Sequence, residues 1–151
     1  ARDHPALWDS GRRLQLVLDL SDRIEGLEAA SPLVAAVEAL APAVFGGRWD
    51  AGLHALLVQD LSLRSAGRRR YNTASMRDLL RAIRNKKNHY YDMDSLMQVL
   101  LGSIPEGYMQ YWTQRFPRLL LELHRLLAHH PAAAPLRAEP AFRAYLPPGT
   151  R

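Results

Sequence analysis

The chain has 151 residues, a length typical of one domain, and 48% of them are hydrophobic, which provides for a packed core and excludes a disordered chain. It contains no cysteine, which excludes disulfides, thiolate-bound zinc and a cysteine nucleophile, and it has no apolar run of 18 residues that could span a membrane. The net charge is +5, yet nine of the 20 Lys and Arg residues and only one of the 15 Asp and Glu residues lie within 64–87.

The first half of the chain has the apolar periodicity of helices. Residues 9–28 are predicted to form the first helix. A second helix is expected over 31–44, where Pro42 should shorten or kink it. A third is predicted over 49–63. The Gly, Ser, Asn and Thr residues of 65–75 indicate a loop.

The helix after this loop carries most of the basic charge. Ser75, with Asp78 three residues later, resembles a capping box, and the helix is predicted to continue to about Tyr90. Its apolar face consists of Met76, Leu79, Leu80, Ile83 and Tyr90. Asn85 and His89 are four residues apart, so they share a face that we expect to be open to solvent, with Arg81 near them. The basic segment fits either a solvated surface or a polyanion-binding one.

The second half predicts further helices and a tail. Helices are expected over 94–101, within 103–116, and from Pro117 to about His130. The proline-rich tail, 131–151, is expected to be extended apart from a turn at 141–145. No strand pattern is evident. The sequence therefore predicts an all-α fold, a compact single domain of about six to eight helices.

Two stretches carry a resemblance to a known family. They are YNTASMRDLLRAIRNKKNHYYD, at 71–92, and LGSIPEGYMQYWTQRFPRLLLELHRLL, at 101–127; HPALWDSGRRLQLVLDLSDRIE, at 4–25, adds to them. Together they resemble the kinase-extension nuclease (KEN) domain, which follows the kinase in the inositol-requiring enzyme of the unfolded protein response and in ribonuclease L. The Lys-Lys-Asn-His-Tyr order at 86–90 is closer to the former.

The resemblance implies a domain organisation and a cellular setting. Residues 1–130 would be the nuclease domain, with 1–8 as the end of a preceding kinase domain, and 131–151 a C-terminal tail. Because the sequence begins abruptly and without methionine, we expect a piece of a longer protein. In that protein the family implies a kinase in cis, a homodimer, and a location on the cytosolic side of the endoplasmic reticulum membrane, with no membrane contact by this segment.

The resemblance also implies an activity and its residues. The family implies a metal-independent endoribonuclease that cleaves RNA hairpin loops, as in mRNA splicing and decay in the unfolded protein response, with no cofactor. The family's catalytic positions match Tyr71, Arg84, Asn85 and His89. The residues expected to bind RNA are Arg68, Arg69, Arg70, Arg81, Lys86 and Lys87. The sequence departs from the family at Asn88, where a second histidine is frequent.

The chemistry of RNA cleavage suits these residue types. Attack of a 2′-hydroxyl on the adjacent phosphorus needs a base, an acid for the leaving 5′-oxygen, and stabilisation of the phosphorane; it leaves 2′,3′-cyclic phosphate and 5′-hydroxyl ends. Histidine can act as an acid near neutral pH, so His89 is assigned that role and Tyr71, aided by cationic neighbours, that of the base. The two roles could be exchanged. Arg84 and Asn85 would hold the phosphate.

Other features have structural interpretations. His124, His129 and His130 have no partner at metal-ligand spacing, so no metal site is expected. Trp8, Trp49 and Trp112 sit beside apolar residues and are predicted to be core. A helical module that binds RNA or a partner, with cleavage weak or lost, remains the alternative to a nuclease.

Overall fold

The computed structural model describes residues 4–64 and 70–150, and within these ranges the regular structure is helical throughout, which confirms the all-α class. The helices of seven or more residues are α1 (Ser10–Glu25), α2 (Pro32–Glu38), α4 (Ala55–Arg64), α5 (Met76–Asn88), α6 (Ser95–Leu101), α7 (Glu106–Arg115) and α8 (Leu119–His129). Shorter turns are η1 (Pro5–Leu7), α3 (Ala41–Val44), η2 (Trp49–Gly52), η3 (Tyr90–Asp92), η4 (Pro131–Ala133), α9 (Ala134–Arg137) and α10 (Pro140–Arg143).

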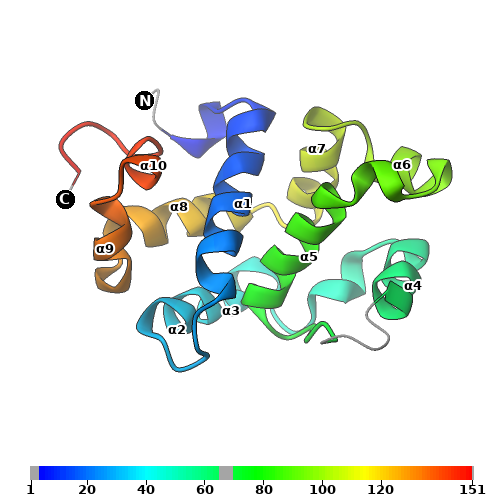
Figure 1. Ribbon diagram of the computed structural model, residues 1–151, viewed down its shortest axis with the longest axis horizontal. Helices are drawn as coiled ribbons and strands as arrows, with labels where there is room; N and C mark the ends of the chain where they lie inside the picture. The colour runs from blue at the N-terminus through cyan, green and yellow to red at the C-terminus, as the bar shows by residue number, and fades with distance from the viewer. Residues whose placement is uncertain (1–3, 65–69, 151) are drawn as a thin grey trace.

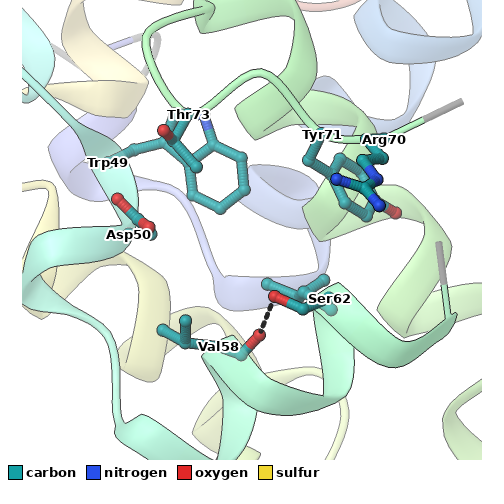
Figure 2. Close-up of a pocket in the computed structure, with 8 residues that line it drawn as sticks. Trp49, Asp50, Val58, Ser62, Arg70, Tyr71 and Thr73 are labelled. Atoms are coloured by element: carbon teal, nitrogen blue, oxygen red, sulfur yellow. Dashed lines mark hydrogen bonds between the residues drawn. The ribbon is translucent and has the colours of Figure 1, made fainter. Parts of the chain in front are cut away.

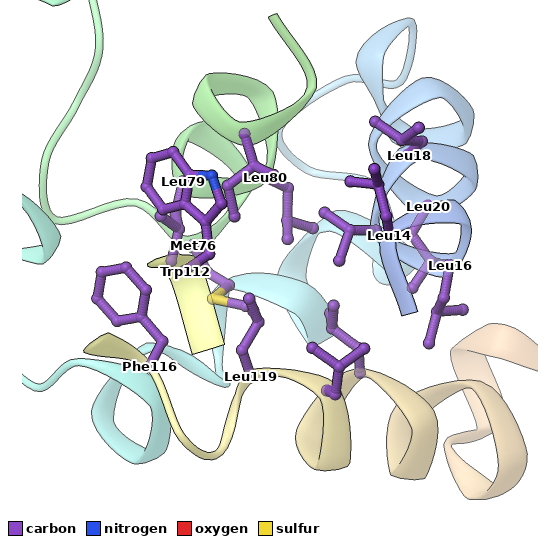
Figure 3. Close-up of a cluster of buried hydrophobic side chains, with 14 of the residues drawn as sticks. Leu14, Leu16, Leu18, Leu20, Met76, Leu79, Leu80, Trp112, Phe116 and Leu119 are labelled. Atoms are coloured by element: carbon purple, nitrogen blue, oxygen red, sulfur yellow. The ribbon is translucent and has the colours of Figure 1, made fainter. Parts of the chain in front are cut away.

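Helices α1 and α5 lie next to each other at the centre of the molecule (Figure 1). α1 begins at Asp9, whose carboxylate accepts the backbone N–H of Arg12 at 2.8 Å and caps the helix. Figure 3 shows leucines of α1 and α5 gathered with Trp112 of α7 and Leu119 of α8 in one apolar cluster. This core fixes α5, which carries Arg84 and Asn85 and ends at its C-cap His89. The three tryptophans are buried, as predicted.

Proline shapes the second helix as expected. α2 ends at Glu38 and α3 begins at Ala41. Pro42 has no N–H to donate to the carbonyl of Glu38, so a continuous helix would leave that carbonyl without its intrahelical bond. The predicted helix over 31–44 is therefore present in two pieces.

The prediction of one helix over 49–63 is wrong. The segment forms η2 and then α4, with Leu53 between them in an extended conformation. The break coincides with a tertiary hydrogen bond, because the hydroxyl of Tyr111 on α7 accepts the backbone N–H of His54 at 3.0 Å. The ring Nδ1 of His54 then accepts the N–H of Leu56 at 3.1 Å, at the start of α4.

Helix α5 follows its predicted design. The Ser75 hydroxyl accepts the N–H of Asp78 at 3.1 Å, which confirms the N-cap. The predicted apolar face is buried in full, from Met76 to Tyr90. The helix ends at Asn88, slightly earlier than expected, and His89 is its C-cap.

Helix α6 stops at Gly102, its C-cap, and the backbone there explains why the residue is a glycine. Gly102 has φ +81°, a left-handed conformation that favours glycine. A Cβ there would lie 2.6 Å from the backbone carbon of Gly107, so no larger side chain fits. The predicted end of the helix at Gly102 is confirmed.

The expectation of an extended tail is wrong. Residues 131–143 form η4, α9 and α10, and Phe142, Tyr145 and Leu146 are buried. The Tyr145 hydroxyl donates to the Asp19 carboxylate on α1 at 2.5 Å. Each of the three short helices has a proline at its first or second position, where proline is compatible with helical structure. The prolines that suggested an extended chain therefore lie at the starts of helices.

Candidate active site

Three of the four predicted catalytic side chains form one hydrogen-bonded chain. The Asn85 amide nitrogen donates to the Tyr71 hydroxyl at 2.9 Å. The Asn85 amide oxygen accepts from the Arg84 guanidinium, at 3.3 Å from Nε and 3.1 Å from Nη2. This pairing sets the orientation of the amide, because a cationic donor on one side requires the oxygen there and directs the NH₂ group to Tyr71. Tyr71 and Asn85, which are 14 residues apart in the sequence, are thus in direct contact in the structure.

Arg84 is also held from behind by α1. Its Nη1 lies 3.4 Å from an Asp22 carboxylate oxygen and 3.6 Å from one of Glu25. The Arg84 side chain is 13% exposed, so most of its surface is occupied by these partners and by neighbouring packing. The packing of α1 on α5 therefore positions the guanidinium that holds Asn85.

Tyr71 lies on the segment before α5, and Trp49 anchors that segment. The Trp49 indole N–H donates to the Asn72 carbonyl at 3.1 Å, and its backbone N–H donates to the Thr73 carbonyl at 2.9 Å. Its ring meets the Tyr71 ring edge-on, with centroids 6.0 Å apart. Asp78 adds a further tie by accepting the N–H of Asn72 at 2.7 Å. Sequence reasoning placed Trp49 in the core but missed this positioning contact.

The prediction that Arg81 faces solvent is wrong. Arg81 is 8% exposed, and its guanidinium lies 4.0 Å from the centre of the Tyr71 ring. Its Nε is 3.5 Å from an Asp78 carboxylate oxygen. The segment of 70–75 covers this side of α5, which helical periodicity alone does not reveal. A buried positive charge therefore sits against the candidate base rather than on an RNA-facing surface.

Lys86 is buried as well. It is 4% exposed, and its ammonium pairs with Asp60 of α4. Burial lowers the pKa of Lys86 to about 8. A direct contact with RNA would require the ammonium to leave this partner, so the surface placement expected of an RNA-binding lysine is not met.

His89 stands at the end of the site. As C-cap of α5 it donates its backbone N–H to the Asn85 carbonyl at 3.0 Å, so it lies one turn beyond Asn85. Its side chain is 63% exposed, with Nδ1 3.7 Å from an Asp92 carboxylate oxygen. Asn85, expected to face solvent, is half-buried. The histidine is thus close along the helix but outside the hydrogen-bonded chain.

The remaining predicted RNA-binding residues differ in their exposure, and two of them lie outside the part of the chain that the structure describes. Arg70 is exposed and Lys87 is half-buried. Arg68 and Arg69 lie outside the described residues. Among 4–64 and 70–150, no group of three His, Asp or Glu side chains could hold a metal ion, and no helix there is long and apolar enough to cross a membrane.

A pocket opens on the other side of Tyr71. It has a volume of about 260 Å³ and is lined by Trp49, Asp50, Val58, Leu61, Ser62, Arg70, Tyr71 and Thr73. Figure 2 shows Trp49 and Asp50 opposite Arg70 and Tyr71, with Val58 and Ser62 along α4. No local motif in the sequence marked Asp50 or Val58, because they reach the site only through the break between η2 and α4.

Comparisons with known proteins identify the family of this chain. Residues 13–145 match the Ribonuclease 2-5A family. The chain is 41% identical over 145 residues to serine/threonine-protein kinase/endoribonuclease IRE1a of Arabidopsis thaliana, covering 94% of this chain and 16% of that protein. It is 40% identical over 146 residues to IRE2 of Homo sapiens, covering 96% and 15%. It is 35% identical over 127 residues to the sensor for unfolded proteins in the ER ire1 of Schizosaccharomyces pombe, covering 83% and 12%.

These relatives are much longer than this chain, which spans 16% or less of the length of each of the three. The family match, in contrast, covers most of the chain and includes every candidate catalytic residue. The chain therefore belongs to the Ribonuclease 2-5A family, and it is a kinase-extension nuclease domain of the type found in IRE1, as its sequence resemblance predicted.

Proposed function

We propose that this chain is an endoribonuclease domain that cleaves RNA in hairpin loops without a metal ion. The observation that carries the proposal is the hydrogen-bonded chain from Tyr71 through Asn85 to Arg84, with His89 one helical turn away. This arrangement places a phenol, an amide, a guanidinium and an imidazole at one end of α5. The names of the relatives, kinase/endoribonucleases, support the same activity.

The reaction is an internal transfer at phosphorus. The 2′-oxygen forms a bond to phosphorus as the bond from phosphorus to the 5′-oxygen breaks. One proton leaves the 2′-hydroxyl for a base and another reaches the 5′-oxygen from an acid. Tyr71 serves as the base and His89 as the acid, and the exchanged assignment is also open. The products carry 2′,3′-cyclic phosphate and 5′-hydroxyl ends.

Charge stabilisation comes from Arg84 and Asn85. The Arg84 guanidinium is oriented before substrate binds, by Asp22 on one side and Asn85 on the other. Donors fixed in advance stabilise developing charge better than donors that must reorganise. Arg81 adds a positive charge against the face of the Tyr71 ring, with its guanidinium carbon 4.0 Å from the ring centre.

The proposal extends to a wider setting, which rests on the family resemblance, and the relatives' kinase/endoribonuclease names support its kinase domain. In the whole protein a kinase domain precedes this one, the active form is a homodimer, and the substrates are stem-loop RNAs in mRNA splicing and decay. The protein would lie on the cytosolic side of the endoplasmic reticulum membrane, since one relative is named a sensor for unfolded proteins in the ER. The exposed part of the basic segment 64–87, which includes Arg70, attracts the RNA.

A direct experiment tests the activity. The chain, fused to a dimerising domain, is incubated with a stem-loop RNA in EDTA, and the ends of the fragments are analysed chemically. We expect cleavage in the loop with 2′,3′-cyclic phosphate ends. RNA that is bound but remains intact would instead support the alternative, a helical module without catalysis, and cleavage that requires added divalent metal would refute the proposed chemistry.

A further inference from the structure

The pocket beside Tyr71 is not used by the proposed reaction. The proposed base and the phosphate-holding groups lie along Tyr71, Asn85 and Arg84, whereas this pocket extends toward η2 and α4 (Figure 2). The two regions share one wall, the half-buried side chain of Tyr71. A ligand group in the pocket would therefore lie next to the linkage that the site cleaves.

The lining of the pocket has an apolar part and a polar part. Val58, Leu61 and the aromatic rings supply apolar surface, while Asp50 and Thr73 supply polar atoms. Trp49 is 1% exposed, so it forms the back wall rather than a surface open on both sides. Apolar walls with a few placed polar groups are typical of sites for flat organic ligands.

Asp50 gives the pocket an anionic acceptor. Arg48 donates to both of its carboxylate oxygens, at 3.0 and 2.8 Å, and these hydrogen bonds lower the pKa of Asp50. An ionised carboxylate only accepts hydrogen bonds, and each oxygen keeps a second lone pair for another donor. The Asp50 side of the pocket is thus suited to a group with N–H donors and unsuited to a phosphate.

Arg70 lies at the opposite wall and is exposed. A guanidinium at this position matches the phosphate of a nucleotide whose base points inward. The lining therefore offers an exposed cation on one side, a carboxylate on the other, and aromatic and apolar walls. These groups match the phosphate and the base of a single unpaired nucleotide.

We propose that this pocket is a subsite for one unpaired nucleobase of the RNA, adjacent to the cleaved linkage, with Asp50 accepting from its N–H groups and Arg70 contacting its phosphate. The proposal rests on the proposed function, because it takes RNA as the substrate. It gives the domain a means to select a nucleotide in a loop, where bases are unpaired, over one in a stem. Base readout is thereby separate from the groups that carry out the reaction.

The test is a double-mutant cycle between RNA and protein, measured as binding. The RNAs are hairpins with a 2′-deoxy nucleotide at the cut site, which prevents cleavage, and with each loop base removed in turn to leave an abasic sugar. We expect one abasic position next to the cut to weaken binding about 10-fold, as loss of one stacked base does. Ser62→Trp fills the pocket and should bind the intact loop as weakly as the wild type binds the abasic loop.

The matched control is Gln59→Trp, which places the same side chain on α4 away from this pocket. It should keep the wild-type affinity and the wild-type sensitivity to the abasic position. Asp50→Asn, which keeps the shape of the pocket, should reduce the differences between loops that carry different bases at that position. Thermal unfolding verifies that each variant is folded; should Ser62→Trp not fold, Asp50→Asn tests the subsite by itself.

Two results would overturn the subsite. One is an abasic effect that is equal in Ser62→Trp and the wild type; the other is the absence of any sensitive loop position. Cleavage of all-ribose hairpins is measured in parallel to keep the two proposals apart. Cleavage without base-sensitive binding would refute the subsite and support the nuclease. Base-sensitive binding without cleavage would refute the nuclease and support the subsite.

Discussion

At the scale of single residues, the site consists of one pre-arranged chain and one exposed group. Tyr71, Asn85 and Arg84 are already hydrogen-bonded to one another. His89 is free of that chain and is mostly exposed, beside Asp92. In the proposed reaction the fixed groups hold the phosphate, and the exposed imidazole approaches the leaving oxygen from the solvent side.

His89→Ala should lower the cleavage rate by about 10²-fold, as loss of a general acid does. Asn85→Ala should have an effect of similar size, because it removes a donor and releases both Tyr71 and Arg84. The matched control is Asn88→Ala, an exposed neighbour on the same helix end, which should cleave at the wild-type rate. Single-turnover rates measure the effect, and thermal unfolding should be unchanged in His89→Ala. Wild-type cleavage by either site variant would contradict the assignment.

Sequence reasoning was uneven at this scale. The resemblance identified Arg84 and Asn85 by motif and Tyr71 by its spacing from Asn85, and the structure brings the three together. It did not foresee the burial of Arg81 and Lys86. Arg81 and Lys86 are buried because the segment of 70–75 and helix α4 cover α5 at these positions. The periodicity within α5 carries no information about these covering elements.

At the scale of elements, α4 is held to α5 by the pair of Asp60 and Lys86, close to the site. Helix positions were predicted well where an apolar face or a cap defined them, as for α1 and α5. The break between η2 and α4 was not predictable locally, because Tyr111 on α7 contributes to it. The helical turns of the tail were missed for a similar reason, since Phe142 and Tyr145 are ordered by burial against distant residues.

Asp60→Asn should destabilise the fold by about 3 kcal/mol, the low end for breaking a buried ion pair, because Asp60 itself is partly exposed. The control is Glu139→Gln, which removes the exposed pair with Arg23 and should cost about 1 kcal/mol or less. Urea unfolding measures both. Equal effects of the two substitutions would show that the pair of Asp60 and Lys86 behaves like a surface pair.

The lowered pKa of Lys86 also predicts a pH dependence. Between about pH 8 and the unfolded pKa near 10.4, the unfolded chain retains a proton that the folded chain has released. The free energy of unfolding of the wild type, relative to Lys86→Met, should therefore rise as pH rises through this window. Urea unfolding of both proteins at pH 7.5 and 9.5 gives the difference. A decrease would mean that attraction to Asp60 outweighs the cost of burial.

At the scale of the whole molecule, this chain spans 16% or less of the length of two relatives that are named kinase/endoribonucleases. The family setting proposed above includes a homodimer held by more surface than 151 residues provide. Small interfaces give weak, concentration-dependent association. Assembly is therefore expected to limit the activity of the isolated domain.

We expect the isolated chain to be mainly monomeric at micromolar concentration, with specific activity that rises with protein concentration. Fusion to a constitutive dimeriser should raise activity by increasing the effective concentration of the second copy. Specific activity across a dilution series, beside sedimentation velocity, measures this. Constant specific activity from a protein that sediments as a monomer throughout would show that each chain is a complete nuclease.

The central claim is that the end of α5 directs attack by the 2′-oxygen of RNA. The most direct measurement compares a stem-loop RNA with the same RNA carrying one 2′-deoxy nucleotide at the cut site, each incubated in EDTA with the dimerised domain, with binding measured alongside. Removal of that single oxygen should abolish cleavage and leave binding nearly unchanged. Cleavage of the deoxy-substituted RNA at the same linkage would contradict the account.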